Sequence, residues 1–175
     1  MTTLSSADQT PFINASRRKR FAAMMYEGAL LFGVVFIADY LFDALTQSRH
    51  GLVLREARQL VIFLAIGLYF MASWRRGGQT LPMRAWHIQL VRPDQKRLNF
   101  GQLTLRYILS WIIPLVGFGI LHWIVMETNF KAAYMLAVGA PFLIFIPTWF
   151  RRDGQFLHDI FSGTRIVDIR HLTKR

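Results

Sequence analysis

Four segments of the chain are almost continuously apolar, and polar or charged stretches separate them. Each segment is close to the roughly 20 residues that cross the hydrocarbon core of a bilayer as a helix. Ionisable residues are rare inside these segments and frequent at their ends. The pattern predicts four membrane-spanning helices, over about residues 21–45, 57–74, 107–126 and 132–150.

The polar stretches predict a small layer of structure outside the membrane. Residues 1–16 predict a mobile N-terminal arm. In the loop at 75–104, WHIQLV alternates moderately between apolar and polar residues, and Pro93 with Asp94 is a turn signal, so we expect a short strand and a hairpin. LPMRAW predicts one turn of helix before that strand. GTRIVDI, in the tail at 151–175, predicts a second short strand.

The basic residues predict the orientation of the helices. The chain has 21 Lys and Arg against 10 Asp and Glu, although 53% of its residues are hydrophobic and 18% are charged. Lys and Arg that flank a span stay on the cytoplasmic side. Most of them lie before the first span, between the second and third, or after the fourth; the exceptions are Arg49, Arg55, Arg58 and Lys131. Both termini are therefore expected to be cytoplasmic.

These observations define the expected fold class and exclude some functions. The fold is an all-α membrane protein, in which a four-helix transmembrane bundle over 17–175 carries a small cytoplasmic hairpin and strand elements. Because the basic residues border apolar spans, they favour anionic lipid headgroups as partners and argue against nucleic-acid binding. The chain has no cysteine, and its five histidines do not fall at metal-ligand spacings, so no metal site or cofactor is expected.

Part of the sequence occurs twice. WRRGGQTL at 74–81 aligns without a gap with FRRDGQFL at 150–157, and the same alignment pairs Leu90 with Ile166 and Val91 with Val167. Basic residues and a glycine turn are common where a helix ends, but this does not explain why glutamine and leucine recur at the same spacing. The match predicts a parallel repeat of two helix pairs, related by an axis along the membrane normal.

An acidic residue in the first span is the clearest candidate for function. Glu27 lies seven residues after Arg20, so the two are about 20° apart on one helix face and about 10 Å apart along the axis. An ionisable residue at membrane depth costs about 2.5 to 3.5 kcal/mol. Glu27 is expected either to bind a cation or a proton, or to form a structural contact with the basic residues of the tail.

Other polar residues in the spans are secondary candidates. Asp39 and Asp43 lie one turn apart near the outer end of the first span, where Arg55 or Arg58 could neutralise them, so we expect a structural role. His122, in the third span, is expected to be a hydrogen-bonded core histidine; a proton relay is the alternative.

Three stretches of the chain carry a family resemblance. The first is RFAAMMYEGALL at 20–31, which holds Arg20 and Glu27. The second, at 78–107, holds Gly78, Gln79, Leu81 and Arg106, and the third is GQFLHDIFSGTRIVDI at 154–169, in which His158 precedes Asp159. In these residues the chain resembles the RDD family of bacterial membrane proteins, named for an arginine and two aspartates. Arg20 and Asp159 match the family pattern, and Glu27 takes the place of its first aspartate.

The resemblance implies a multi-pass protein of the bacterial inner membrane, and some members of the family are credited with sodium/proton antiport. It also implies that Arg20, Glu27 and Asp159 form one cluster, which binds ions or protons or has a structural role.

The first functional hypothesis is accordingly a monovalent-cation/proton exchanger that works as a homo-oligomer, because four helices leave little room for a pathway. The second is a noncatalytic scaffold or accessory subunit for another membrane protein. A lipid-active enzyme with His158 and Asp159 as acid and base is the weakest alternative, since no metal or phosphate motif accompanies them, and we expect no enzyme.

Overall fold

The computed structural model describes residues 13–47, 54–94, 96–150 and 154–170. Within them, four helical segments are long and apolar enough to cross a membrane, as the sequence predicts. They are α1 (Arg17–Thr46), α2 (Arg55–Gly77), α4 (Phe100–Thr128) and a fourth span in which the 3-10 helix η1 (Lys131–Phe145) continues into α5 (Ile146–Trp149). α1 and α4 begin before their apolar segments, so each carries basic residues near its N-terminus.

The fourth span differs from the expected α-helix in its winding. A 3-10 helix rises about 2.0 Å per residue, so the 15 residues of η1 cover about 30 Å, the thickness of the hydrocarbon core. An α-helix of the same length would cover about 23 Å. Apolar composition predicts that this segment spans the membrane, but it does not distinguish a 3-10 helix from an α-helix. The two helices differ in which carbonyl accepts from each backbone N–H, and composition does not determine that choice.

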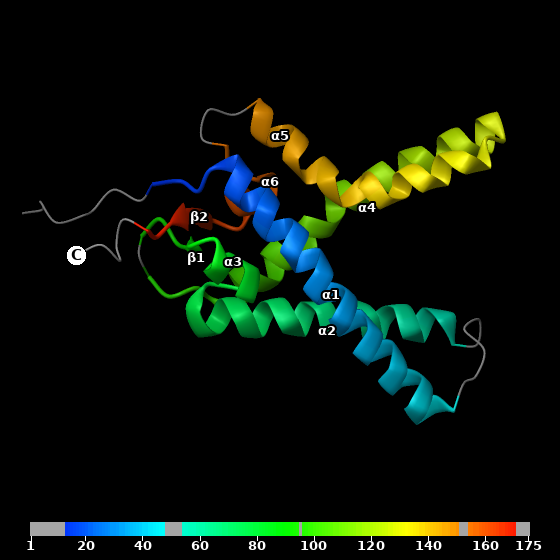
Figure 1. Cartoon of the computed structure of the whole chain (residues 1–175), viewed down its shortest axis with the longest axis horizontal. Helices are drawn as coiled ribbons and strands as arrows, with labels where there is room; N and C mark the ends of the chain where they lie inside the picture. Colours follow the sequence, from blue (N-terminus) through cyan, green and yellow to red (C-terminus); the bar gives the residue numbers. More distant parts are fainter. Residues whose placement is uncertain (1–12, 48–53, 95, 151–153, 171–175) are drawn as a thin grey trace, which may run out of the picture.

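The spans form two hairpins, α1 with α2 and α4 with η1, whose outer ends diverge (Figure 1). Only 6% to 17% of the most apolar window of each span is buried inside the protein. The remaining apolar surface therefore faces lipid. The hairpins meet where α2 packs on α4: a Cβ atom at Gly67 would lie 3.0 Å from the Tyr107 ring, and Tyr107 Oη donates to the Phe63 carbonyl at 2.6 Å.

Short elements form a layer at the ends of the hairpins where α1 begins (Figure 1). They are α3 (Leu81–Ala85), β1 (Ile88–Val91), α6 (Leu157–Phe161) and β2 (Arg165–Asp168). Both predicted strands form, but the hairpin predicted within residues 75–104 is not present in the described part of that loop. β1 instead pairs antiparallel with β2 from the tail. A strand needs a partner edge, and the repeat supplies it from the other half of the chain.

The internal repeat is visible in the backbone. α3 and α6 begin at the aligned residues Leu81 and Leu157. The aligned glycines Gly78 and Gly154 both have left-handed φ, +67° and +59°, and so do the aligned His87 and Gly163, at 54° and 63°. Leu90 pairs with its own repeat equivalent, Ile166, in the sheet. Such self-pairing is what a two-fold axis through the sheet produces. Arg151 and Arg152 of the repeat lie outside the described residues.

The end of the predicted N-terminal arm is attached to this layer. Asn14 forms an isolated bridge with Val167, and the Ala15 N–H donates to the Ile166 carbonyl at 3.1 Å. The Ser16 side chain then caps α1 by accepting from the Lys19 N–H. The last residues of the predicted arm thus extend the edge of β2. Residues 1–12 lie outside the described part of the chain.

Candidate functional site

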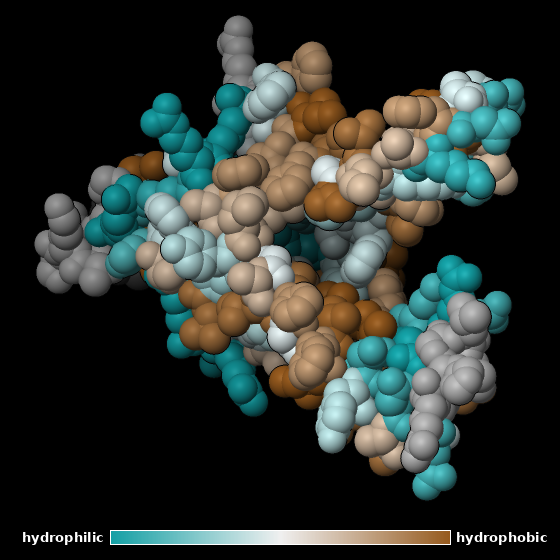
Figure 2. All heavy atoms as spheres, turned by 45° about the vertical axis from the view of Figure 1, so that its right-hand side comes forward, coloured by the Kyte–Doolittle hydropathy of each residue, from teal (hydrophilic) through white to brown (hydrophobic). Residues whose placement is uncertain are grey.

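A cavity of about 360 Å³ lies where α1, α2, α4, η1 and the strand layer meet. Its walls are mainly aromatic and aliphatic, and its polar lining comprises Arg20, Glu27, Arg106, Ser110 and His158. Figure 2 shows a hollow among apolar side chains with hydrophilic atoms at its base. The cavity thus brings sequence candidates from three elements together with an apolar wall, and it is our candidate site.

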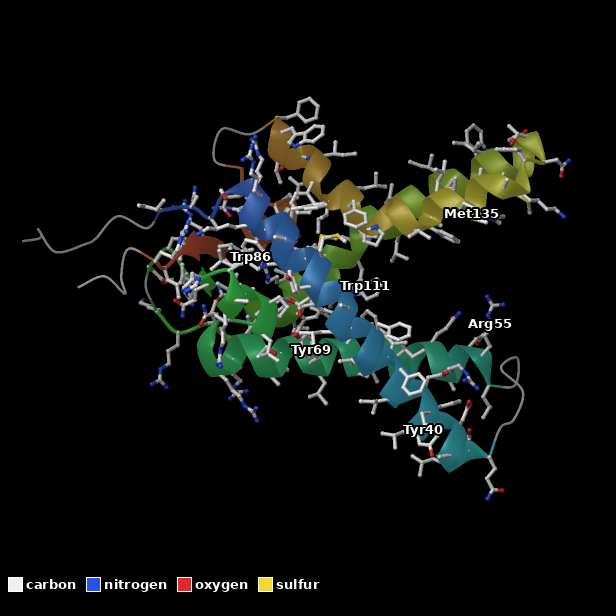
Figure 3. All side chains as sticks on the ribbon, viewed as in Figure 1. Tyr40, Arg55, Tyr69, Trp86, Trp111 and Met135 are labelled. Carbon is white, nitrogen blue, oxygen red and sulfur yellow. The ribbon has the colours of Figure 1, made fainter. Side chains whose placement is uncertain are left out.

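Glu27 is held by two hydroxyl groups. Its side chain is buried, its Oε1 accepts from Tyr69 Oη at 2.5 Å, and its Oε2 accepts from Thr80 Oγ1 at 2.6 Å. Thr80 is also the N-cap of α3, where its oxygen accepts from the Met83 N–H. Tyr69 lies on α2 near its crossing with α1 (Figure 3). The carboxylate therefore joins α1 to α2 and α3 through neutral partners.

Arg20 does not bond to Glu27 but crosses to the tail. Its guanidinium donates to the Gly154 carbonyl at 2.5 Å and to the Ile166 carbonyl at 3.4 Å, and it lies 5.4 Å from the centre of the Phe156 ring. The side chain is 3% exposed. Arg20 and Glu27 share one helix face, as predicted, and both line the cavity. Their hydrogen-bond partners are different groups, so the two side chains belong to separate sets of contacts.

Asp159 belongs to a third set of contacts. It is fully buried, and its Oδ1 accepts from Arg106 Nη1, which also donates to Thr164 Oγ1 at 3.1 Å. The Arg106 guanidinium lies 5.0 Å from the centre of the Trp74 ring. The secondary candidate Arg106 is therefore the partner of Asp159, and this ion pair fastens α6 to α4.

His158 lies beside the same ion pair. Its Nε2 is 3.3 Å from Asp159 Oδ1, and the side chain is buried. Burial lowers the pKa of His158 well below 6.5, and the positive charges of Arg106 and Arg20 lower it further. The imidazole is therefore neutral near pH 7. The described residues contain no group of three or more His, Asp or Glu placed to hold a metal ion.

The remaining candidates lie away from the cavity. Arg58 contacts both Asp39 and Asp43, at 2.6 and 2.5 Å, which confirms the expected neutralisation and selects Arg58 over Arg55. Arg55 points away from the helices (Figure 3). His122 Nδ1 lies 2.6 Å from Tyr134 Oη, but His122 is exposed to lipid between the outer parts of α4 and η1. The prediction of a core histidine is thus wrong in burial, because the outer ends of the hairpins diverge.

Comparison with known proteins identifies the family. The model of the RDD family matches residues 14–163, which include both helical hairpins and the Arg106–Asp159 pair. The chain belongs to the RDD family. No curated protein and no solved structure matches it.

The two hydroxyl partners of Glu27 in this RDD protein were not among the predicted site residues. Thr80 had a signal, since a threonine directly before LPMRA is placed to cap a short helix. Tyr69 had none, because a single tyrosine in an apolar span is usually a packing residue. Only the crossing of α1 and α2 brings its hydroxyl to Glu27.

Proposed function

We propose that this RDD protein exchanges a monovalent cation for protons and that Glu27 is the residue the two ions share. The observation that carries the proposal is the environment of Glu27, a buried carboxylate that lines a cavity and is bonded to two hydroxyls instead of an arginine. Hydroxyls orient a carboxylate without neutralising it. A proton or a cation must therefore supply the missing charge.

The charges around the cavity support competition between the two ions. Arg106 is paired with Asp159, and Arg20 donates to backbone carbonyls about 10 Å from Glu27 along α1. Tyr69, Tyr107 and His158 are the other titratable side chains at or beside the site. A carboxylate at membrane depth costs about 2.5 to 3.5 kcal/mol. Binding of either a proton or a cation to Glu27 removes this cost, and binding of one makes the other unnecessary. The two ions therefore compete for Glu27, and this competition allows exchange.

The proposal includes an orientation in the bacterial inner membrane. Both termini and the strand layer lie in the cytoplasm, because the basic residues cluster there, and the cavity then opens in the cytoplasmic half of the protein. The chain has no cysteine, so an introduced cysteine is a unique label. In intact cells, a membrane-impermeant maleimide should label Lys131→Cys and not Lys96→Cys. The reverse pattern would contradict the orientation.

Proton flux in proteoliposomes tests the exchange. A gradient of a monovalent cation, inorganic or organic, should drive proton movement with the wild type, and Glu27→Gln should abolish it because an amide cannot release a proton. Glu127→Gln is the matched control, since Glu127 is exposed at the outer end of α4 and should leave flux unchanged. Unchanged flux in Glu27→Gln would remove Glu27 from the mechanism.

A scaffold or accessory subunit is the second candidate, and the Arg106–Asp159 pair favours it. The pair fastens the strand layer to α4 and takes no part in the proposed exchange. It keeps the surface of that layer rigid, as expected of a surface that a partner protein must recognise. Absence of flux from the folded wild type over all monovalent cations tested would leave the scaffold as the better proposal.

A further inference from the structure

The cavity is much larger than an alkali ion requires. Its volume is about 360 Å³, whereas one water molecule occupies about 30 Å³ of the liquid. A site for Na⁺ or K⁺ encloses the ion in oxygen ligands, but most of this lining is apolar. The volume instead falls in the range of roughly 300 to 1,000 Å³ that is typical of sites for organic ligands.

The walls favour a cation. Phe70, Trp74, Tyr107 and Trp111 all line the cavity, and the face of an aromatic ring attracts positive charge. Quaternary ammonium groups are recognised in proteins by such aromatic surroundings. The hollow opens among apolar side chains (Figure 2), so a ligand that dissolves in lipid can enter it.

The polar groups also favour a cation over an anion. An anion attracted to Arg106 would compete with Asp159, which already neutralises that guanidinium. Arg20 lies at the cytoplasmic end, where it is bonded to the Gly154 and Ile166 carbonyls. Glu27 has neutral partners, and each of its oxygens can accept more than the one hydrogen bond it receives. The negative charge available to a ligand is therefore that of Glu27.

We infer that the cavity binds a lipophilic organic cation, an ammonium or phosphonium with apolar or aromatic substituents, with Glu27 as its counter-ion. The inference rests on the proposed exchange and names the class of its substrate. When the cation enters, the protonated Glu27 carboxyl loses its proton to water and becomes the carboxylate that pairs with the cation. One proton is thus released for each cation bound, and no other bond changes.

Two probes of nearly the same shape and opposite charge test the inference. Tetraphenylphosphonium and tetraphenylborate are titrated separately into the purified full-length protein in detergent micelles, with protein-free micelles as the blank. Binding is followed by tryptophan fluorescence, to which Trp74 and Trp111 in the cavity lining contribute. Proton release is measured in weakly buffered solution. We expect the phosphonium to bind with release of about one proton and the borate to bind at least tenfold more weakly.

Variants separate the charge of Glu27 from its structural role. Glu27→Gln should weaken phosphonium binding at least tenfold and abolish proton release. Glu27→Asp keeps the charge and should retain both, although with a shorter reach. Glu127→Gln should match the wild type. Elution of each variant as a single species on gel filtration shows that it is folded. Binding to folded Glu27→Gln with wild-type affinity would overturn the assignment of Glu27 as counter-ion.

The outcomes distinguish this inference from the proposed function. Preference for the borate would overturn the organic-cation assignment and indicate a site for lipophilic anions. If neither probe binds but Na⁺ or K⁺ drives proton flux, exchange stands and the organic substrate is wrong. If neither probe binds and no cation drives flux, both proposals fail.

Discussion

Asp159→Asn removes the negative charge of the buried ion pair between α4 and α6. Arg106 and Asp159 are 5% and 0% exposed, and the pair joins α6 to α4. Asparagine keeps the shape and can still accept a hydrogen bond, but it leaves the guanidinium of Arg106 buried without a counter-charge. Thr164 and the Trp74 ring remain as its contacts, and neither is an anion.

The magnitude follows from this burial. Removing one member of a buried ion pair typically costs about 3 to 5 kcal/mol, mainly because the other charge remains buried. Retention of the hydrogen bond places Asp159→Asn near the lower end, so we expect the free energy of unfolding to fall by about 3 kcal/mol. A double variant, Arg106→Met with Asp159→Leu, buries no charge and should recover most of this loss.

Reversible unfolding in mixed detergent micelles, followed by tryptophan fluorescence, measures these changes. Asp94→Asn is the control, because Asp94 pairs with Arg92 on an exposed loop and should change stability little. Our reasoning is refuted if Asp159→Asn unfolds like the control, or if the double variant is less stable than the single one. Either result would mean that the charge of Arg106 is solvated in the folded protein.

Two further predictions concern the strand layer. Burial alone would raise the pKa of Asp168, but hydrogen bonds from Lys19 and Arg170 outweigh it and hold the pKa at about 2. This contribution to stability is present above pH 4 and is lost as the pH falls towards 2. In acid titrations followed by circular dichroism, Asp168→Asn should therefore lose less stability than the wild type between pH 4 and pH 2. Gly78→Ala should lower the free energy of unfolding by at least about 2 kcal/mol, since φ is +67° and the new Cβ would meet the Leu90 carbonyl at 2.4 Å. Gly101→Ala is the control and should be nearly neutral, because a Cβ there has no atom within 4 Å. Denaturant titrations measure both changes. Equal effects of the two alanines would show that the Gly78 turn is not strained.

The site was only partly predictable from the sequence. Glu27 is conspicuous in the sequence because a charged residue in an apolar segment is costly, and the family resemblance adds Arg20 and Asp159 to it. Their pairing was not predictable. A helix face places Arg20 near Glu27, but whether they bond depends on groups from distant segments, and the carbonyls of Gly154 and Ile166 compete for the guanidinium.

Some features of this RDD protein were determined by the sequence alone. Four apolar segments predict four spans because hydrocarbon requires every backbone polar group to be bonded within its own helix. The glycines and leucines that recur in the two halves predict the repeat, since a left-handed turn favours glycine wherever it occurs.

Other features were decided only in three dimensions. The partner of β1, the winding of η1 and the hydroxyls that hold Glu27 depend on contacts between segments far apart in the chain. Local composition records how much each segment resembles lipid or water. It does not determine which distant group contacts a buried charge in the folded protein. That contact distinguishes Asp159, which forms an ion pair, from Glu27, which has neutral partners.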